Sequence, residues 1–438
     1  MGRIIVSSDR SGSGKTVITS GIMRALSKTF KVAPFKAGPD FIDPGYHRIA
    51  TGVHSANLDL WLMGEEEVKR ALVRYSKGYD VSVIEGVMGL YDGIGIRYST
   101  YELSEVTKSP VVLLVNCSNV STTAAAVVHG LKTFRNARIK GVIFNMVGSE
   151  RHFSYCKEGL EGVKVLGYIP YSKDLKVPSR HLGLVTVEDL NQAERVIKTA
   201  SELVESYVDL DGLKEIAGEA GELEVEGEEE AETRRPLGKA AIAYDQAFSF
   251  YYRDNLEVLG RYYELEFFSP LRGETVEGAD FIYIGGGYPE LHLSDLESST
   301  RTKGWLKKSS EDGVPILAEC GGLMYLSSEL VDDRGYKMVG LFDIAIKAKD
   351  RLTIGYTELE ALEDNLLSSR GTSVRGHEFH YSRPISVGDV KLVFRNKVGK
   401  GIVDGKDGAS VYNTLATYSH FYFRTTTLSS RLPLEPLQ

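Results

Sequence analysis

The first half of the chain alternates short apolar runs with stretches of helical periodicity. Consecutive apolar, mostly β-branched positions are typical of strands that are buried on both faces of a parallel sheet. Thr16–Leu26 and Val187–Tyr207 have the periodicity of helices. The pattern predicts an α/β, doubly wound domain. The predicted strands are Ile4–Val6, Val32–Phe35, Val81–Ile84, Val111–Val115, Val142–Phe144 and Val165–Ile169.

The second half restarts the strand pattern after a Glu-rich segment. Residues 215–232 contain nine Glu and neither Lys nor Arg. Such a segment buries too little apolar surface to offset its ordering entropy. We interpret 215–236 as an acidic linker between domains at 1–214 and 237–438; an exposed helix end is the alternative. The runs beyond it are Ala240–Tyr244, Tyr263–Phe268, Phe281–Ile284 and Ile316–Ala318, with Val374–Tyr381 and Ala416–Phe423 expected as half-buried strands or loop edges.

Composition and charge narrow the class of protein. The chain has 438 residues, and its net charge is −8, from 52 basic and 60 acidic residues. Without the nine Glu of the acidic segment, the two signs nearly balance. We expect no nucleic-acid partner and no membrane partner. Three cysteines do not suggest a disulfide framework, and no apolar run is long enough to span a bilayer, so a cytoplasmic location is expected.

A phosphate loop follows the first predicted strand. The motif S-G-S-G-K-T at residues 11–16 opens the first helix, although Asp9 stands where the full motif has Gly. Gly12 and Gly14 would let backbone N–H groups curl around phosphate oxygens. Lys15 would reach the β- and γ-phosphates, and the Thr16 hydroxyl would ligate Mg²⁺.

Acidic residues follow the next strands of this half. Asp40, Asp43, Glu85 and Asp92 fall near the carboxyl ends of strands, where open α/β sheets bind ligands. Glu85 ends an apolar strand, as an acid that orients Mg²⁺ would. Asn145 ends another strand, where it could read adenine or cap a turn. His47 and the other histidines of this half are expected to be structural or surface residues.

A cysteine nucleophile is the strongest candidate in the second half. Cys320 follows a strand and precedes Gly-Gly and a helix, the arrangement of a nucleophile elbow. We expect the helix N-terminus to lower the pKa of its thiol. The G-G-G-Y-P-E run at residues 285–290 offers backbone N–H groups for an oxyanion hole. The nucleophile also needs a base, for which the candidates are His377, His380 and His420.

Six motifs in order resemble the cobyrinate a,c-diamide synthase family. The resemblance covers nearly the whole chain, and the segment at residues 38–43 favours this family over the related cobyric acid synthases. It implies a dethiobiotin-synthetase-like P-loop domain followed by a class I glutamine amidotransferase domain. The motifs are S-G-S-G-K-T, K-A-G-P-D-F-I-D, I-E-G-V-M-G-L-Y-D-G, G-G-G-Y-P-E-L, A-E-C-G-G-L-M-Y-L and G-H-E-F-H-Y-S.

For the second half, the resemblance implies a glutaminase. Cys320 would attack the glutamine amide, the backbone near Gly286 and Gly287 would stabilise the oxyanion, and His420 would be the base. Many class I glutaminases have an acid two residues after this histidine, where this chain has Tyr422. The orientation of His420 is therefore unexplained by the sequence. His377 and His380 would shape the interface or the substrate site.

For the first half, the resemblance implies a ligase that forms C–N bonds. ATP and Mg²⁺ would lie at Lys15, Thr16 and Glu85, and Asn145 would contact the nucleotide. A substrate carboxylate would become an acyl phosphate that ammonia converts to an amide, with glutamine as the amido donor. Asp40, Asp43, Glu85 and Asp92 match the family's functional acids. Small molecules are the expected partners, and the sequence does not decide whether the chain forms a homodimer.

The choice of substrate is open within this resemblance. Cobyrinate, in cobalamin biosynthesis, is the favoured substrate, and hydrogenobyrinate and nickel sirohydrochlorin are alternatives because relatives share the motifs. A more distant alternative is a partition-type switch ATPase. Such proteins carry a Lys five residues before the P-loop Lys, where this chain has Arg10, and the Cys320 domain has no place in them.

Overall fold

The computed structural model describes residues 2–176, 187–225 and 236–426. It divides into two compact units, Met1–Glu229 and Glu230–Gln438. The division falls inside the acidic segment. Residues 215–218, at the start of that segment, belong to a helix that ends at Gly218, and the interpretation of the remainder as a linker stays a prediction.

A seven-stranded parallel sheet forms the first unit, in the order β3-β2-β4-β1-β5-β6-β7. The runs predicted from the sequence all fall in its strands, and the short β3 is an addition. The predicted doubly wound α/β fold is confirmed. The strands are β1 (Gly2–Ser8), β2 (Val32–Ala37), β3 (Ala56–Leu58), β4 (Val81–Glu85), β5 (Val111–Asn116), β6 (Ile139–Val147) and β7 (Lys164–Pro170).

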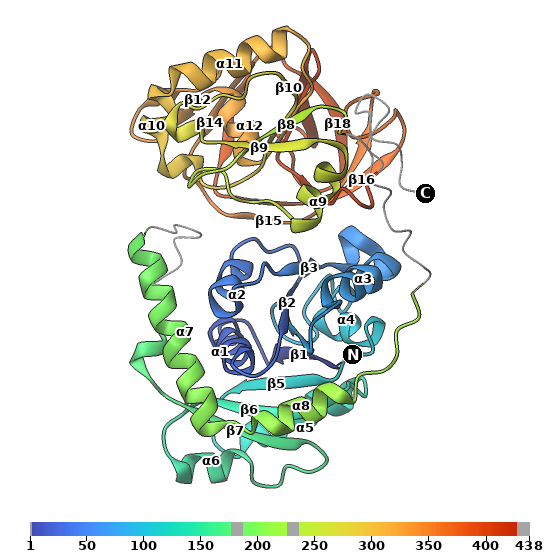
Figure 1. The fold of residues 1–438 in the computed structure, drawn as a ribbon, viewed down its shortest axis with the longest axis vertical. Helices are drawn as coiled ribbons and strands as arrows, with labels where there is room; N and C mark the ends of the chain where they lie inside the picture. Colours follow the sequence, from blue (N-terminus) through green and yellow to red (C-terminus); the bar gives the residue numbers. More distant parts are fainter. Residues whose placement is uncertain (1, 177–186, 226–235, 427–438) are drawn as a thin grey trace. The chain divides into compact units, whose positions relative to one another are not determined.

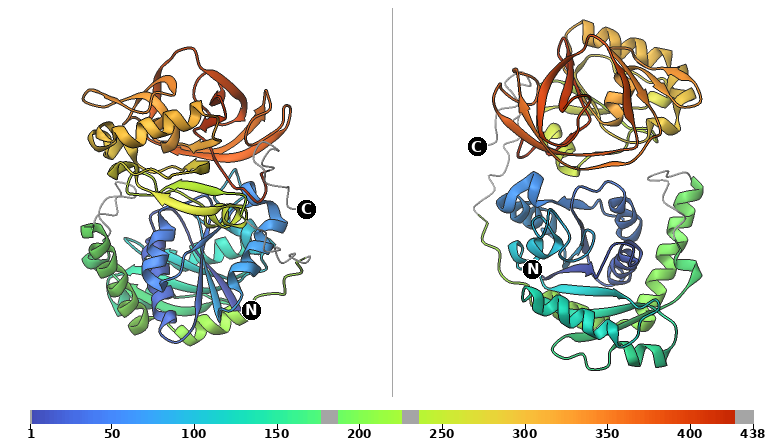
Figure 2. Two further views of the ribbon diagram at one scale, coloured as in Figure 1. Left: turned by 45° about the horizontal axis from the view of Figure 1, so that its top comes forward. Right: turned by 180° about the vertical axis from the view of Figure 1, so that it is seen from behind.

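Helices cover both faces of this sheet (Figures 1 and 2). In Figure 1, α1, α2 and α7 pack together on one side, and α3 and α4 lie on the other. The helix predicted at Val187–Tyr207 is α7. The helices are α1 (Lys15–Ser27), α2 (Asp43–Thr51), α3 (Leu60–Ser76), α4 (Thr100–Val106), α5 (Thr123–Phe134), α6 (Glu150–Cys156), α7 (Val187–Tyr207) and α8 (Leu210–Gly218).

The second unit contains a ten-stranded mixed sheet, in the order β21-β16-β15-β18-β19-β20-β11-β10-β8-β9. The part from β20 to β9 is parallel, and the remainder is antiparallel. The strands of this sheet are β8 (Lys239–Ala243), β9 (Glu264–Phe268), β10 (Ala279–Ile284), β11 (Ile316–Glu319), β15 (Thr353–Ala361), β16 (Ser373–His380), β18 (Lys391–Val398), β19 (Lys406–Val411), β20 (Thr414–Thr417) and β21 (His420–Phe421).

A four-stranded sheet and short helices complete this unit. Most of the strands beyond residue 326 escape the sequence pattern, because their burial alternates or is interrupted by polar positions, as in β14 and β15. The additional elements are β12 (Ser327–Val331), β13 (Gly335–Lys337), β14 (Phe342–Lys347), β17 (Arg383–Val387), α9 (Arg253–Tyr262), α10 (Leu293–Ser298), α11 (Thr300–Glu311) and α12 (Gly321–Leu326).

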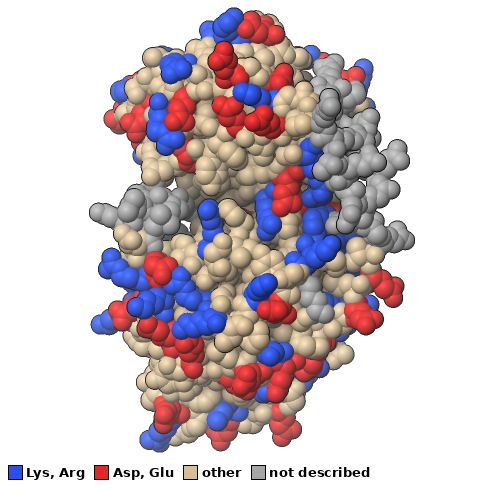
Figure 3. Space-filling view, viewed as in Figure 1, with Lys and Arg blue, Asp and Glu red and all other residues tan. Residues whose placement is uncertain are grey.

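Both signs of charge are mixed on the surface. On the face shown in Figure 3, Lys and Arg are interspersed with Asp and Glu over each unit. This mixing agrees with the near balance of charges outside the acidic segment. None of the helices in the described part of the chain is both long and apolar enough to cross a membrane.

Candidate active sites

The phosphate loop lies between β1 and α1. Gly12 and Gly14 have φ angles of 78° and 84°, a left-handed conformation that favours glycine. Lys15 begins α1, and its Nζ donates hydrogen bonds to Ser8 Oγ at 3.0 Å and to the Met88 carbonyl at 2.7 Å. The loop therefore has the backbone and the lysine that phosphate binding requires.

Thr16 meets a carboxylate at the end of β4. Its Oγ1 donates to Oε1 of Glu85 at 2.8 Å, and Glu85 is fully buried. Mg²⁺ prefers such oxygen ligands. Among the described residues, no group of three or more His, Cys, Asp or Glu could hold a metal by itself. Thr16 and Glu85 fit Mg²⁺, and their role as ligands stays a prediction.

Lys36, in β2, lies beside three acidic residues: Asp40 in the loop after β2, Asp43 at the start of α2 and Glu85 at the end of β4. Its Nζ lies 2.7 Å from Asp43, 3.1 Å from Glu85 and 3.9 Å from Asp40, measured to carboxylate oxygens. His47 Nε2 lies 2.6 Å from the other oxygen of Glu85. The register of the sheet explains the arrangement, because Lys36 and Glu85 are direct neighbours on β2 and β4. Three of the four predicted acids thus belong to one cluster.

Burial and charge compete within this cluster. Burial acts to raise the pKa of Glu85, but Lys36 and His47 outweigh it, and the net shift is downward. For Asp43, burial followed by the charges of Asp40 and Glu85 raises the pKa to about 8. Burial acts to lower the pKa of Lys36, and the surrounding carboxylates raise it above its ordinary value. Asp43 is therefore the member that can exchange a proton near neutral pH.

Asp92 and Asn145 make contacts of their own. Asp92 is exposed, and its Oδ2 accepts from the Gly89 N–H at 2.9 Å in the loop after β4. Asn145 is buried, its Nδ2 donates to the Ser13 carbonyl at 2.8 Å, and its Oδ1 accepts from the Met146 N–H at 2.9 Å. Asn145 therefore supports the phosphate loop in this structure, and its contact with adenine stays a prediction.

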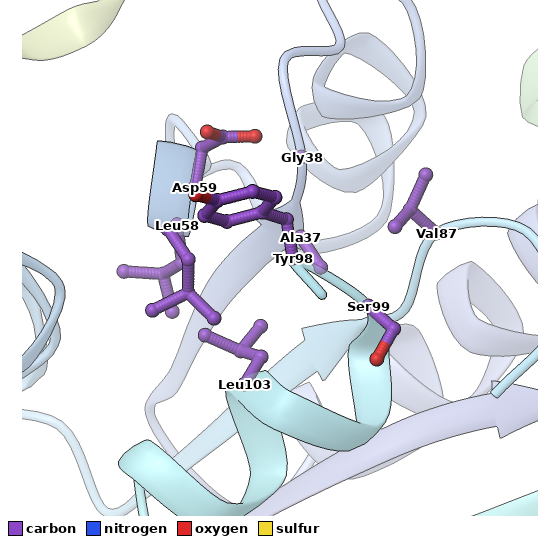
Figure 4. Close-up of a pocket in the computed structure, with 9 residues that line it drawn as sticks. Ala37, Gly38, Leu58, Asp59, Val87, Tyr98, Ser99 and Leu103 are labelled. Atoms are coloured by element: carbon purple, nitrogen blue, oxygen red, sulfur yellow. The ribbon is translucent and has the colours of Figure 1, made fainter. Parts of the chain in front are cut away.

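A pocket opens where β2 and β3 end and the loop after β4 passes (Figure 4). The Tyr98 ring lies beside Leu58 and Asp59, and Val87 is on the opposite side, with Gly38 between them. Ala37, the residue that follows Lys36, is part of the lining, so the pocket adjoins the charged cluster. The pocket is lined by Ala37, Gly38, Leu58, Asp59, Leu60, Val87, Tyr98, Ser99 and Leu103.

Cys320 occupies a strained turn between β11 and α12. Its φ is 50°, a left-handed value that is rare for a residue with a side chain. Its N–H donates to the Thr417 carbonyl at 2.7 Å, and its Sγ donates to the Phe379 carbonyl at 3.4 Å. The turn has the geometry of a nucleophile elbow, in which strain presents the reactive atom.

The expected lowering of the Cys320 pKa is wrong. Cys320 is 1% exposed, and burial, followed by the charge of Glu290, raises the pKa of its thiol above the ordinary value. The helix that follows has only six residues, and its N-terminal dipole does not offset the desolvation. A thiol in this environment would need a general base to act as a nucleophile.

The glycine loop after β10 lies between the Cys320 turn and His420. A Cβ added to Gly286 would lie 2.4 Å from Cε1 and 3.1 Å from Nε2 of His420. A Cβ added to Gly321 would lie 3.1 Å from the Gly287 nitrogen and 3.4 Å from the Gly286 carbonyl carbon. The structure thus brings together the four predicted glutaminase residues, while their catalytic roles stay predictions.

Two histidines of β16 flank this site. The His377 ring stacks on His420, with centroids 4.9 Å apart, and the two residues are direct partners on β16 and β21. His380 stacks on Tyr418 with centroids 4.0 Å apart. Burial lowers the pKa of both β16 histidines, to about 4 for His380. Of the three candidate bases, His420 is the one whose ring packs against Gly286 of the glycine loop.

Two contacts at these sites were not predicted from the sequence. The sequence indicates a structural or surface role for His47, yet it is buried against Glu85. Its position four residues after Asp43 on one face of α2 is a signal that could have found it. Glu319 lies 3.5 Å from His420, measured from Oε2 to Nδ1. Its position directly before the nucleophile is the corresponding signal.

Comparison with known families assigns a domain type to each unit. Residues 4–185 match the CobQ/CobB/MinD/ParA nucleotide binding domain, and residues 239–427 match the CobB/CobQ-like glutamine amidotransferase domain. The first match agrees with the phosphate loop, and the second agrees with the cysteine elbow. The amidotransferase domain also argues against the alternative of a partition-type switch ATPase, which would not need it.

Similar proteins extend over nearly the whole chain. A cobyrinate a,c-diamide synthase of Sulfurisphaera tokodaii is 60% identical over 96% of this chain and 97% of its own. That of Saccharolobus solfataricus is 59% identical over 97% of this chain and 98% of its own. The Methanocaldococcus jannaschii protein of the same name is 42% identical over 96% of each chain.

Proposed function

Because the chain belongs to the cobyrinate a,c-diamide synthase family, we propose that it amidates the a and c carboxylates of cobyrinate, with glutamine as the nitrogen donor and ATP as the activating substrate. The observation that carries this proposal is the presence of two built sites, one in each unit. The first unit has a phosphate loop beside a buried carboxylate cluster, and the second has a cysteine elbow against a glycine loop and a histidine.

The second unit would release ammonia from glutamine. His420 takes the proton of the Cys320 thiol, and the sulfur forms a bond to the side-chain amide carbon. The N–H groups near Gly286 and Gly287 stabilise the oxyanion. The C–N bond then breaks as His420 returns the proton to the leaving ammonia, and water hydrolyses the thioester to glutamate.

The first unit would use that ammonia to form an amide. A carboxylate is a poor acyl donor at neutral pH, so an oxygen of the substrate carboxylate attacks the γ-phosphorus and ADP leaves. Ammonia attacks the carbonyl carbon of the acyl phosphate, the C–O bond breaks, and phosphate departs. Lys15 offsets the charge of the transferring phosphoryl group.

Other groups of the first unit have supporting roles in this proposal. Thr16 and Glu85 would hold Mg²⁺, which supplies charge neutralisation at the phosphates when it is bound. Lys36 and His47 keep Glu85 charged and fixed. Burial raises the pKa of Asp43 to about 8, and in its ionised form it would accept the proton that the attacking ammonia loses. Asp40 and Asp92 would position the substrate, since both are on loops at the carboxyl ends of strands.

The test is an assay of the purified chain with ATP, Mg²⁺ and glutamine against cobyrinate, hydrogenobyrinate and nickel sirohydrochlorin side by side. We expect glutamate, ADP and the diamide to form fastest with cobyrinate, because the similar proteins bear that name. Faster turnover of another tetrapyrrole would overturn the choice of substrate. No glutamate with any of them would overturn the function.

Cys320→Ala tests whether the two sites are separate. This variant is expected to lose all glutamine-dependent amidation, because no other group can form the thioester. It should keep amidation from ammonium chloride, since the synthetase site is in the other unit. Loss of both activities in a folded variant would contradict the assignment of one reaction to each unit.

A further inference from the structure

His420 has a carboxylate neighbour that does not come from its own strand. Class I glutaminases commonly supply an acid two residues after the histidine, and this chain has the buried Tyr422 there. Glu319, the last residue of β11, instead places Oε2 3.5 Å from His420 Nδ1. The side chain of Glu319 is 2% exposed and that of His420 is 0% exposed, so the pair is shielded from solvent and its electrostatic interaction is little screened.

From this geometry we infer that Glu319 is the positioning residue of the glutaminase base. An ionised carboxylate only accepts hydrogen bonds, so beside Nδ1 it selects the tautomer that carries its proton on Nδ1. In this tautomer Nε2 carries the lone pair that accepts the Cys320 proton. The proton moves from Sγ to Nε2 and on to the ammonia, and the carboxylate of Glu319 stabilises the imidazolium in between without taking the proton itself.

Two donors fix Glu319 in this position. The Tyr283 hydroxyl donates to Oε2 at 2.9 Å, and the backbone N–H of Phe421 donates to Oε1 at 3.2 Å. Asn255 supports the arrangement, because its Nδ2 donates to the Phe421 carbonyl at 2.8 Å and its Oδ1 accepts from the Phe423 N–H at 2.9 Å. The carboxylate is thus tied both to the neighbouring strand β10 and to the residue that follows the base.

The same placement couples the base to the nucleophile. Glu319 is adjacent to Cys320 in the chain, and it is the direct register partner of Thr417 on β20. The Cys320 N–H donates to the carbonyl of that same threonine at 2.7 Å. One short segment, the end of β11, therefore sets both the sulfur and the carboxylate that orients the imidazole. A separate acid after the histidine is unnecessary in this arrangement.

The experiment compares Glu319→Gln with the native chain. This inference rests on the proposed glutaminase, so glutamine hydrolysis by the native chain is measured first. Glu319→Gln keeps the size of the side chain and removes its charge. We expect kcat for glutamine hydrolysis to fall at least about 100-fold with little change in KM. Amidation from ammonium chloride should be unchanged, because that site is in the other unit, and a native thermal unfolding midpoint shows that the variant is folded.

The pH profile separates positioning from a merely structural role. The titratable groups that face His420 include Glu319 from β11, and His377 and His380 from β16, besides the Cys320 thiol that the proposal places beside it. Glu319→Gln removes a carboxylate beside the ring, so the imidazolium is less stable and the acid limb of kcat/KM should move to lower pH. A structural defect would lower the whole profile without moving its limb.

Two further variants complete the test. Tyr283→Phe removes one anchoring donor and keeps the charge, so kcat should fall less and the acid limb should not move. Asp254→Asn is the matched control, since Asp254 is a buried carboxylate of the same unit that is paired with Arg424 at 2.7 Å. It should lose stability and keep the native pH profile.

The outcomes distinguish the inference from the proposed function. Glutaminase activity in Glu319→Gln at the native rate, or a lowered rate with an unmoved acid limb, would overturn the role of Glu319 and leave the glutaminase intact. If Glu319→Gln does not fold, a native rate in Tyr283→Phe would overturn the anchoring of the carboxylate. Absence of glutamine hydrolysis in the native chain would overturn the proposed function itself.

Discussion

Gly286 is the position where the smallest change should have the largest effect on the glutaminase. Gly286→Ala adds one methyl group, which would lie 2.4 Å from Cε1 of His420. Carbon atoms approach to about 3.5–4.0 Å at best, so the imidazole or the loop must move by more than about 1 Å. The clash is with a ring that is 0% exposed and is stacked on His377. The ring therefore has no open space into which it can retreat.

The expected loss follows from that displacement. Moving a catalytic group by about 1 Å costs on the order of 100-fold in rate, and overpacking a buried site costs about 1–3 kcal/mol of stability. The assay is kcat for glutamine hydrolysis, with ammonia-dependent amidation and thermal unfolding measured on the same samples. Glutamine hydrolysis should fall about 100-fold, whereas amidation from ammonium chloride should be close to native.

Gly304→Ala is the matched control. Gly304 is inside α11, and a Cβ added there meets no heavy atom within 4 Å. The same substitution should leave glutamine hydrolysis unchanged and raise the free energy of unfolding by up to about 1 kcal/mol, because alanine favours a helix interior. A native rate of glutamine hydrolysis in Gly286→Ala would refute the reasoning, since it would mean that the glycine loop does not confine the base.

Two further changes test buried charges, one in each unit. Lys36→Met leaves Asp43 and Glu85 buried without the lysine that pairs with both. The free energy of unfolding should therefore fall by about 3–5 kcal/mol. An unchanged midpoint of urea-induced unfolding at pH 7 would contradict this. Burial, with Glu378, raises the pKa of Asp407 to about 7 in the folded chain. An unfolded aspartate titrates near pH ~4, so this group makes the native chain lose stability as pH rises from about 4 to about 7. Asp407→Asn should remove that loss of stability. If the free energy of unfolding of the variant and of the native chain changed in parallel with pH, the assignment of the loss to Asp407 would be refuted.

The first unit illustrates how far a sequence pattern can reach. Its strands are apolar at consecutive positions because both faces of the parallel sheet are covered, so each predicted run coincides with a strand. The phosphate loop is equally local, because its glycines, lysine and threonine all lie within residues 12–16. In the second unit, most strands beyond residue 326 pair antiparallel and alternate in burial. Their stability comes from partners that are distant in the chain, which a local pattern does not reveal.

The same contrast, between local sequence patterns and contacts that are distant in the chain, applies to the sites. The sequence by itself determined the candidate site residues, since the motifs around Lys15, Glu85 and Cys320 each lie within a few consecutive positions. Only the tertiary structure decided how these groups are tuned. Burial raises the pKa of the Cys320 thiol despite the helix that follows it, and the register of β2 with β4 places Lys36 beside Glu85. The contact of Glu319 with His420 joins residues 101 positions apart. Electrostatic and steric effects depend on distance in space and on exclusion of water, and folding alone sets both.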